Sequence, residues 1–285
     1  LNIQKTYKIF IGGKFPRTES GRYYPINDAN GKLIANMCLS SRKDFKNAVV
    51  AARKAQEGWA GLTAFNRGQI LYRLAEMLET RRGAFLDEMR ALGLSKKAAV
   101  AEMDQSIDRL LYYAGWCDKY TAVFSSVNPT ASAHFNFSVH EPTGVVAAIA
   151  TENSPLLGLI SVIAPAIAGG NSIIVLASES MATSAISFAE VVQNSDVPGG
   201  VVNILTGKMK ELLPQMASHM DVNALVLSRS STESKELEAV IGNVKRLIDW
   251  SNKSNDQNPY MILDLQEVKT TWHPVQMSSS AGGGY

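Results

Sequence analysis

The fold is decided by residues 144–157, GVVAAIATENSPLL. A run of apolar residues, several of them β-branched, ends at Thr151, and the chain becomes apolar and helical in pattern after Pro155. Strand, polar elbow and helix in this order are typical of a parallel α/β sheet, which presents functional groups at the carboxyl ends of its strands. The elbow, TENSP at residues 151–155, is therefore the first candidate for a functional site.

The same rhythm continues beyond the elbow. Short apolar runs alternate with longer segments of helical periodicity, and the connections between them are short. Alternating units of this kind predict a parallel, doubly wound sheet. We expect strands at residues 145–150, 172–176, 201–205 and 224–227, and helices at residues 155–168, 182–193 and 212–219.

The first 120 residues have a different texture. Two short strands, residues 7–13 and 21–26, have glycines between them and predict a hairpin-like opening. From Ser41 onward, apolar residues recur at helical spacing, and their aromatic and methionine stripes indicate a packed core. We expect helices at residues 41–59, 66–94 and 98–120.

Residues 134–140, HFNFSVH, alternate strictly between polar and apolar, as a half-exposed strand does. Phe135 and Phe137 fall on one face and the two histidines on the other, so a solvated polar face is favoured over a metal-ligand pair. The covered apolar face is expected to serve self-association or docking, unless the chain's own helices cover both rings. The apolar face carries Phe135, Phe137 and Val139, and the polar face carries His134, Asn136, Ser138 and His140.

Composition excludes several classes. Apolar residues make up 46% and charged residues 19% of the 285 residues, which supports a substantial core. A formal net charge of +2, without long charged runs, gives no argument for nucleic acid or for an anionic membrane surface. The two cysteines and four scattered histidines show neither a disulfide framework nor metal-ligand spacing. We expect a cytoplasmic globular α/β protein, and the initial Leu1 suggests a piece of a longer one.

Three regions follow from these patterns. Residues 1–143 hold the N-terminal strands, the helical layer and the strand at 134–140. Residues 144–265 form an α/β domain of the dinucleotide-binding type. Residues 266–285 are expected to hold a C-terminal strand and a disordered Ser/Gly tail.

Several segments resemble the aldehyde dehydrogenase superfamily in its order and spacing. YKIFIGGKF at 7–15, LYYAGWCDK at 111–119, EPTGVV at 141–146, APAIAGGNSIIV at 164–175 and DVPGGVVNILTG at 196–207 carry the resemblance. It implies a Rossmann-type sheet, an N-terminal helical layer and small oligomerisation strands, with the catalytic domain missing. The piece TTWHPV at 270–275 and the truncated end resemble the C-terminal half of aldehyde dehydrogenase family 16, where two such domains occur in tandem.

The elbow differs from the superfamily's usual PWNFP. Asn153 matches the residue whose amide donates to the oxyanion, but Glu152 and Ser154 replace the Trp and the Phe. A carboxylate at 152 in the family's orientation would repel dinucleotide phosphates. We therefore favour a vestigial Asn153 that caps the helix beginning near Pro155.

Cofactor contacts implied by the resemblance are depleted as well. Residues 176–179, LASE, correspond to the family's KPAE motif. Glu179 could accept hydrogen bonds from ribose hydroxyls, but Leu176 replaces the lysine. Gly207 retains one glycine of a glycine-rich turn, and Arg229 occupies a turn where glycine normally lets the backbone approach the cofactor. The alternatives are a surface Glu179 and a vestigial site. We expect no cofactor, or NAD if any.

The catalytic groups implied by the resemblance are incomplete. Asp249, in IDWSNK, stands for the general-base glutamate. The family's nucleophilic cysteine follows a few tens of residues later, but residues 254–285 contain none, and Cys38 and Cys117 match no catalytic position. We interpret the chain as a pseudoenzyme domain that oligomerises or docks within a larger protein. The alternatives are a part of an active NAD-dependent aldehyde dehydrogenase with its cysteine elsewhere, and a dinucleotide-sensing module.

Overall fold

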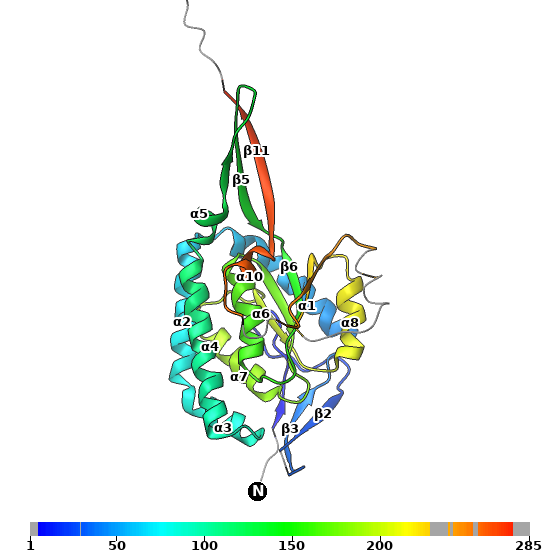
Figure 1. Ribbon diagram of the computed structural model, residues 1–285. Helices are drawn as coiled ribbons and strands as arrows, with labels where there is room; N and C mark the ends of the chain where they lie inside the picture. Colours follow the sequence, from blue (N-terminus) through cyan, green and yellow to red (C-terminus); the bar gives the residue numbers. More distant parts are fainter. Residues whose placement is uncertain (1–4, 29, 229–238, 240–241, 253–255, 276–285) are drawn as a thin grey trace, which may run out of the picture.

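In the computed structural model, helices cover both faces of a central sheet, and a narrow stalk projects from one end of the body (Figure 1). The structure describes residues 5–28, 30–228, 239, 242–252 and 256–275. The strands are β1 Thr6–Tyr7, β2 Tyr23–Asn27, β3 Leu33–Cys38, β4 Ser126–Asn128, β5 His134–Pro142, β6 Val145–Ile149, β7 Ser172–Leu176, β8 Val202–Leu205, β9 Ala224–Leu227, β10 Arg246–Asp249 and β11 Gln266–Pro274. The helices are α1 Arg42–Ala60, α2 Ala64–Thr80, α3 Arg82–Ala91, α4 Lys96–Trp116, α5 Tyr120–Phe124, α6 Leu157–Ala168, α7 Thr183–Gln193, α8 Met209–Ser218 and α10 Tyr260–Leu263.

The central sheet is parallel throughout, in the order β10-β9-β6-β7-β8. This confirms the doubly wound α/β sheet, and four of its strands lie within a residue of the expected positions. The fifth strand, β10, has no apolar run of its own, which is why sequence periodicity does not reveal it. Helices α1 and α8 cover one face, and α2, α4, α6 and α7 cover the other.

Period-two alternation along β6 distributes the core between these two layers. Val146 and Ala148 pack in the cluster that includes α6 and α7, while Val145, Ala147 and Ile149 pack in the cluster that includes α1 and α8. All five side chains are fully buried. Burial on both faces explains why a parallel strand reads as a continuous apolar run.

The N-terminal strands and helices differ from expectation in several places. Of the strand expected at residues 7–13, only Tyr7 lies in β1. The helix expected at residues 98–120 ends at Trp116, and α5 begins at Tyr120. β1 and β2 do not form a hairpin, because β3 lies between them and pairs with both. The expected single helix at 66–94 is two helices, α2 and α3, that meet at Arg81. The start of α1 is as expected, since Ser41 and Asp44 form a reciprocal capping box.

We call the projecting sheet of β4, β5 and β11 the stalk; β5 pairs with β11 over its whole length and with β4 along part of it (Figure 1). The expected solvated polar face of β5 is only partly found, because His134 is exposed but Asn136 is only 2% exposed. The alternative that the chain's own helices cover both phenylalanine rings is wrong, because Phe135 is 47% exposed. The Asn128 side chain donates to Asn136 Oδ1 at 2.6 Å, and Trp272 is the β11 partner of Asn136. Neighbouring strands thus bury Asn136 on the polar face, while on the other face Phe135 is exposed and Phe137 is partly buried against His273.

The C-terminal segment supplies both a short helix, α10, and the outer strand β11. β11 lies within the expected C-terminal strand region of residues 266–285. The Ser/Gly tail, residues 276–285, lies outside the described residues. None of the described helices is both long and apolar enough to cross a membrane.

Candidate functional site

The candidate site lies at the carboxyl edge of the central sheet. From β6 the chain passes to β7 and β8 on one side and later returns to β9 and β10 on the other, so the winding direction reverses at β6. Ligands of open α/β sheets bind outside the carboxyl ends of the strands at such a reversal. The elbow at residues 151–155 follows β6 directly and therefore occupies this position.

Asn153 is exposed, and its side chain makes no hydrogen bond with the described residues. The expectation that it caps the following helix is wrong. Ser154 takes that role, because its hydroxyl accepts a hydrogen bond from the Gly158 amide at 2.7 Å. The helix begins at Leu157, two residues later than expected, which places Ser154 rather than Asn153 over its first turn.

A carboxylate from another helix completes the cap. Glu102, on α4, accepts hydrogen bonds at Oε1 from the amides of Leu156 and Leu157, at 3.1 and 2.9 Å. The Ser154 hydroxyl donates to the same oxygen at 2.5 Å. An anion at the start of α6 satisfies two amides that lack intrahelical partners and interacts favourably with the helix dipole. The polar elbow is thereby joined to the helical layer.

Glu152 is bound by the loop that follows β7. Its carboxylate accepts hydrogen bonds from the amides of Glu179 and Ser180, at 3.0 and 2.7 Å, and from the Ser180 hydroxyl at 2.8 Å. The Ser178 hydroxyl lies 3.1 Å from Oε1 and 3.0 Å from the backbone oxygen of Glu152. The residue that we expected to repel phosphates instead fills the loop after β7.

Glu179 is partly buried in this loop, and its carboxylate accepts no hydrogen bond from the described residues. Beside it lies Tyr24, which is 8% exposed. The pKa of Tyr24 is raised by burial and by the nearby carboxylates of Glu179 and Glu152. Sequence patterns assign Tyr24 only to a strand, and the structure adds this tyrosine to the site.

Gly207 has a structural explanation. Its φ of +149° is disfavoured for other residues, and a Cβ there would lie 3.2 Å from the Ser40 amide nitrogen. Ser40 donates to the Thr206 carbonyl at 3.0 Å, so the segment after β3 covers the turn. Gly207 is buried beneath this segment, so the close backbone approach that it allows is that of Ser40.

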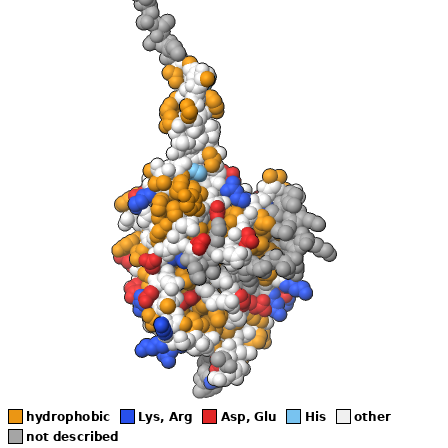
Figure 2. Space-filling view, viewed as in Figure 1, with side chains coloured by type: hydrophobic (Ala, Val, Ile, Leu, Met, Phe, Trp, Pro, Cys, Tyr) orange, Lys and Arg blue, Asp and Glu red, His pale blue; other side chains and the backbone are white. Residues whose placement is uncertain are grey.

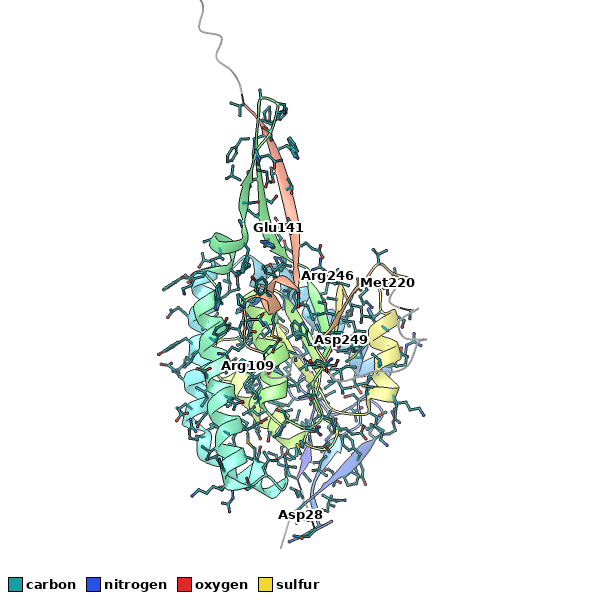
Figure 3. All side chains as sticks on the ribbon, viewed as in Figure 1. Asp28, Arg109, Glu141, Met220, Arg246 and Asp249 are labelled. Atoms are coloured by element: carbon teal, nitrogen blue, oxygen red, sulfur yellow. The ribbon has the colours of Figure 1, made fainter. Side chains whose placement is uncertain are left out.

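Asp249 ends β10 and is exposed (Figure 3). Its Oδ1 accepts a hydrogen bond from the Ser251 amide at 2.8 Å. Asp249 and Ile149 are in register two strands apart, so their Cα atoms are about 10 Å from each other. The general-base candidate and the elbow therefore share one edge without direct contact between these two strand ends. Arg229 lies outside the described residues.

Both cysteines are buried, Cys38 at 3% and Cys117 at 0% exposed. Burial raises the pKa of both thiols, that of Cys117 to about 12. Cys117 also donates its thiol hydrogen to the Tyr113 carbonyl. Neither thiol has the exposed, electropositive surroundings that produce a reactive thiolate. In the described part of the chain, no group of three His, Cys, Asp or Glu side chains could hold a metal ion.

Sequence patterns could not reveal Glu102 or Tyr24 as members of this edge. Glu102 lies 52 residues before Ser154 in the chain. It is one of three acidic residues on an amphipathic helix. Only the packing of α4 against α6 brings it to the elbow. A glutamate facing away from the core stripe is the ordinary pattern of a solvated helix face, so its sequence signal is weak.

The fold places this chain among α/β proteins with a Rossmann-type parallel sheet, here with a helical layer and a projecting stalk. The profile of the aldehyde dehydrogenase family matches residues 15–273, and the chain belongs to that family. Retinal dehydrogenase 2 of Gallus gallus is 34% identical over 257 residues, which cover 87% of this chain and 49% of the relative. Cytosolic 10-formyltetrahydrofolate dehydrogenase of Mus musculus is 30% identical over 255 residues, or 87% and 28% of the two chains.

Solved structures agree with this assignment. The NAD⁺ complex of aldehyde dehydrogenase from Bacillus cereus superposes with a TM-score of 0.81 at 26% identity, over 86% of this chain and 50% of that one. PnpE in complex with nicotinamide adenine dinucleotide gives a TM-score of 0.81 at 27% identity, over 85% and 50%. The chain thus spans about half the length of these solved relatives.

Proposed function

We propose that these 285 residues form a non-catalytic domain of the aldehyde dehydrogenase family that acts by self-association or by docking to a tandem aldehyde dehydrogenase domain. The burial of Cys38 and Cys117 carries this proposal. Aldehyde oxidation in the family proceeds through a thiolate that attacks the carbonyl, and a buried thiol with a raised pKa supplies no such nucleophile. Asn153 and Asp249 are then remnants of a catalytic edge.

The test is oxidation of short, long and aromatic aldehydes by the purified chain with NAD or NADP. We expect no cofactor reduction above a protein-free blank. Reduction that disappears in Cys117→Ser or Cys38→Ser would contradict the proposal. Reduction that appears only when a cysteine-bearing dehydrogenase domain is added would favour the second candidate, in which this chain is part of an active NAD-dependent enzyme.

The residues at the sheet edge do not fit a dinucleotide. Leu176 is fully buried where the resemblance places a lysine, and Ser40 covers Gly207. The amides after β7 already bind Glu152. We propose that NAD and NADP bind no more tightly than a Kd of about 1 mM, or roughly −4 kcal/mol. A micromolar Kd by calorimetry, lost in Glu179→Ala, would favour the sensing module instead.

The stalk is the proposed association surface. Phe135 is 47% and Val127 is 69% exposed, and the rings of Phe135 and Phe137 lie 5.6 Å apart. Together with Val139 these side chains line a shallow apolar hollow. Hydrophobic atoms are visible along the stalk in Figure 2. Exposed apolar side chains on a sheet of three strands are an aggregation hazard unless a partner covers them. A second copy of the chain would bury both phenylalanine faces.

The double substitution Phe135→Ser and Phe137→Ser should shift the species seen by light scattering toward monomer and leave the helical circular dichroism unchanged. Val268→Ser is the matched control, because Val268 is 60% exposed and pairs with His140 on the opposite face. A wild-type chain that is already monomeric at tens of micromolar would refute the association surface. Dissociation by the control as well would place the interface elsewhere on the stalk.

We further propose a cytoplasmic location and a place in aldehyde dehydrogenase family 16. Two free cysteines support a reducing compartment. The name of the mouse relative includes the word cytosolic. The resemblance of residues 270–275 supports the subgroup. A search of the full-length protein for an upstream dehydrogenase domain with its own cysteine would test the tandem arrangement.

A further inference from the structure

The loop after β7 surrounds a carboxylate with hydrogen-bond donors. Oε1 of Glu152 accepts from the amide and the hydroxyl of Ser180, at 2.7 and 2.8 Å, and lies 3.1 Å from the Ser178 hydroxyl. Oε2 accepts from the Glu179 amide at 3.0 Å. Both oxygens of one carboxylate are therefore bound by three consecutive residues. Convergent amides and hydroxyls of this kind make an anion-binding concavity.

The base of the loop has a contact that does not involve Glu152. The Ser178 hydroxyl also accepts a hydrogen bond from the Met181 amide at 3.1 Å, which closes the loop on itself. Ser178 is 3% exposed, so the base of the loop is anchored in the core, while Ser180 is exposed. A loop that is fixed at its base and open at its rim keeps its donors oriented when its ligand leaves.

A second observation points to a ligand at this place. The Tyr24 hydroxyl is buried and has no hydrogen-bond partner among the described residues. The carboxylates of Glu152 and Glu179 lie near enough to raise the pKa of Tyr24. A buried phenol normally has a hydrogen-bond partner. The Gly207 backbone lies near the Tyr24 hydroxyl but without good hydrogen-bond geometry, so this hydroxyl is an unpaired polar group near the carboxylates of Glu152 and Glu179.

We propose that residues 178–180 form a carboxylate-binding cradle, and that Glu152 is a tethered ligand that fills it and excludes free oxyanions. The other end of the elbow is held to α4, because the Ser154 hydroxyl donates to Glu102. Removing the Glu152 carboxylate, while keeping the donors, opens a site for a small free carboxylate. The cradle does not rest on the proposed function, because it concerns binding and not chemistry.

Thermal unfolding of Glu152→Ala in sodium acetate, with sodium chloride at equal ionic strength as reference, tests the cradle. We expect this variant to melt below the wild type in chloride and to recover most of the difference in acetate. The wild type corrects for the general stabilisation that excluded salts give to any protein. The apparent affinity of the variant for acetate, from the dependence of Tm on concentration, should exceed that of the wild type at least tenfold.

Two further variants localise the effect. Glu179→Ala removes a neighbouring carboxylate that accepts no hydrogen bond from the described residues, so it should show neither the loss nor the acetate response. Glu152→Ala combined with Ser180→Ala lacks one donor and should respond to acetate several-fold more weakly than Glu152→Ala. The melting of Glu152→Ala is also measured in sodium phosphate. Recovery of its Tm in phosphate but not in acetate would overturn the assignment to carboxylates.

The remaining outcomes are also decisive. Equal melting of Glu152→Ala and the wild type, or equal effects of acetate and chloride on the variant, would overturn the cradle. Should the variant not fold in chloride, its refolding yield is compared with and without acetate. Folded protein obtained only with acetate supports the cradle, and failure in both salts overturns it.

Discussion

Glu102→Ala should destabilise the chain by about 2–3 kcal/mol. The change removes the acceptor of the Leu156 and Leu157 amides, whose residues are 0% and 6% exposed. A buried donor that loses its partner costs about 1–3 kcal/mol, and values near the low end of this range for the two amides give the total. The loss of a helix cap alone costs up to about 2 kcal/mol, which is consistent with this range. The Ser154 hydroxyl can still accept from Gly158, so the cap is weakened and not abolished.

The assay is thermal unfolding followed by circular dichroism. An unfolding entropy of about 2.1 cal/mol/K per residue amounts to about 0.6 kcal/mol/K for this chain, so Tm should fall by about 4 °C. Asp104→Ala is the matched control on α4, because Asp104 pairs with Arg82 in an exposed ion pair at 2.6 Å. Such pairs are worth about 0–1 kcal/mol. A Tm for Glu102→Ala no lower than that of the control would refute the capping role.

Three other outcomes follow from burial and backbone geometry. Cys38 and Cys117 should stay unmodified by a thiol-reactive dye at pH 8 and react fully in guanidinium, since both are buried. Rapid labelling of one thiol in the native chain would contradict their burial. Burial raises the pKa of Glu88 above its ordinary 4.5. Above that pH the folded state keeps a proton that the unfolded chain loses, so stability should fall as pH rises from about 4.5 through the folded pKa. Urea midpoints at pH 5 and 7 measure this fall in stability, and Glu88→Gln should make the fall smaller. An unchanged pH dependence in the variant would show that Glu88 is not its cause. Gly207→Ala should lower the free energy of unfolding in denaturant by about 1–3 kcal/mol, because Gly207 has a positive φ. Gly58→Ala, at an open position in α1, should raise it by about 0.5–1 kcal/mol. Equal effects of the two changes would contradict the role given to the positive φ.

Local patterns were sufficient to predict the central sheet. Residues 172–176 and 224–227 are strands with the expected bounds, because strands buried on both faces appear as continuous apolar runs. The start of α1 was also predictable, since Ser41 caps it through contacts only three residues away. In contrast, β10 contains Arg246 and Asp249 at its ends and has no apolar run, so only its pairing with β9 defines it.

The candidate edge could be located from sequence, but its interactions could not. TENSP follows β6 and therefore had to lie at the carboxyl end of the sheet. Which side chain caps α6 depends on where the helix begins and on what α4 brings to it, and Ser154 and Glu102 met only through packing. The partners of Glu152 lie 26 to 28 residues away in the chain, a separation that no local pattern encodes.

The stalk shows the same division on one strand. The alternation in residues 134–140 determines that Phe135 and Phe137 share a face opposite Asn136, because successive side chains of a strand point to opposite sides. It does not determine which of the two faces meets water. That was decided by β4 and β11: the Asn128 side chain donates to Asn136 and Trp272 pairs with it, whereas His273 stacks on Phe137 and Phe135 stays 47% exposed. A period of two assigns side chains to faces, whereas exposure depends on the neighbours that tertiary structure brings to each face.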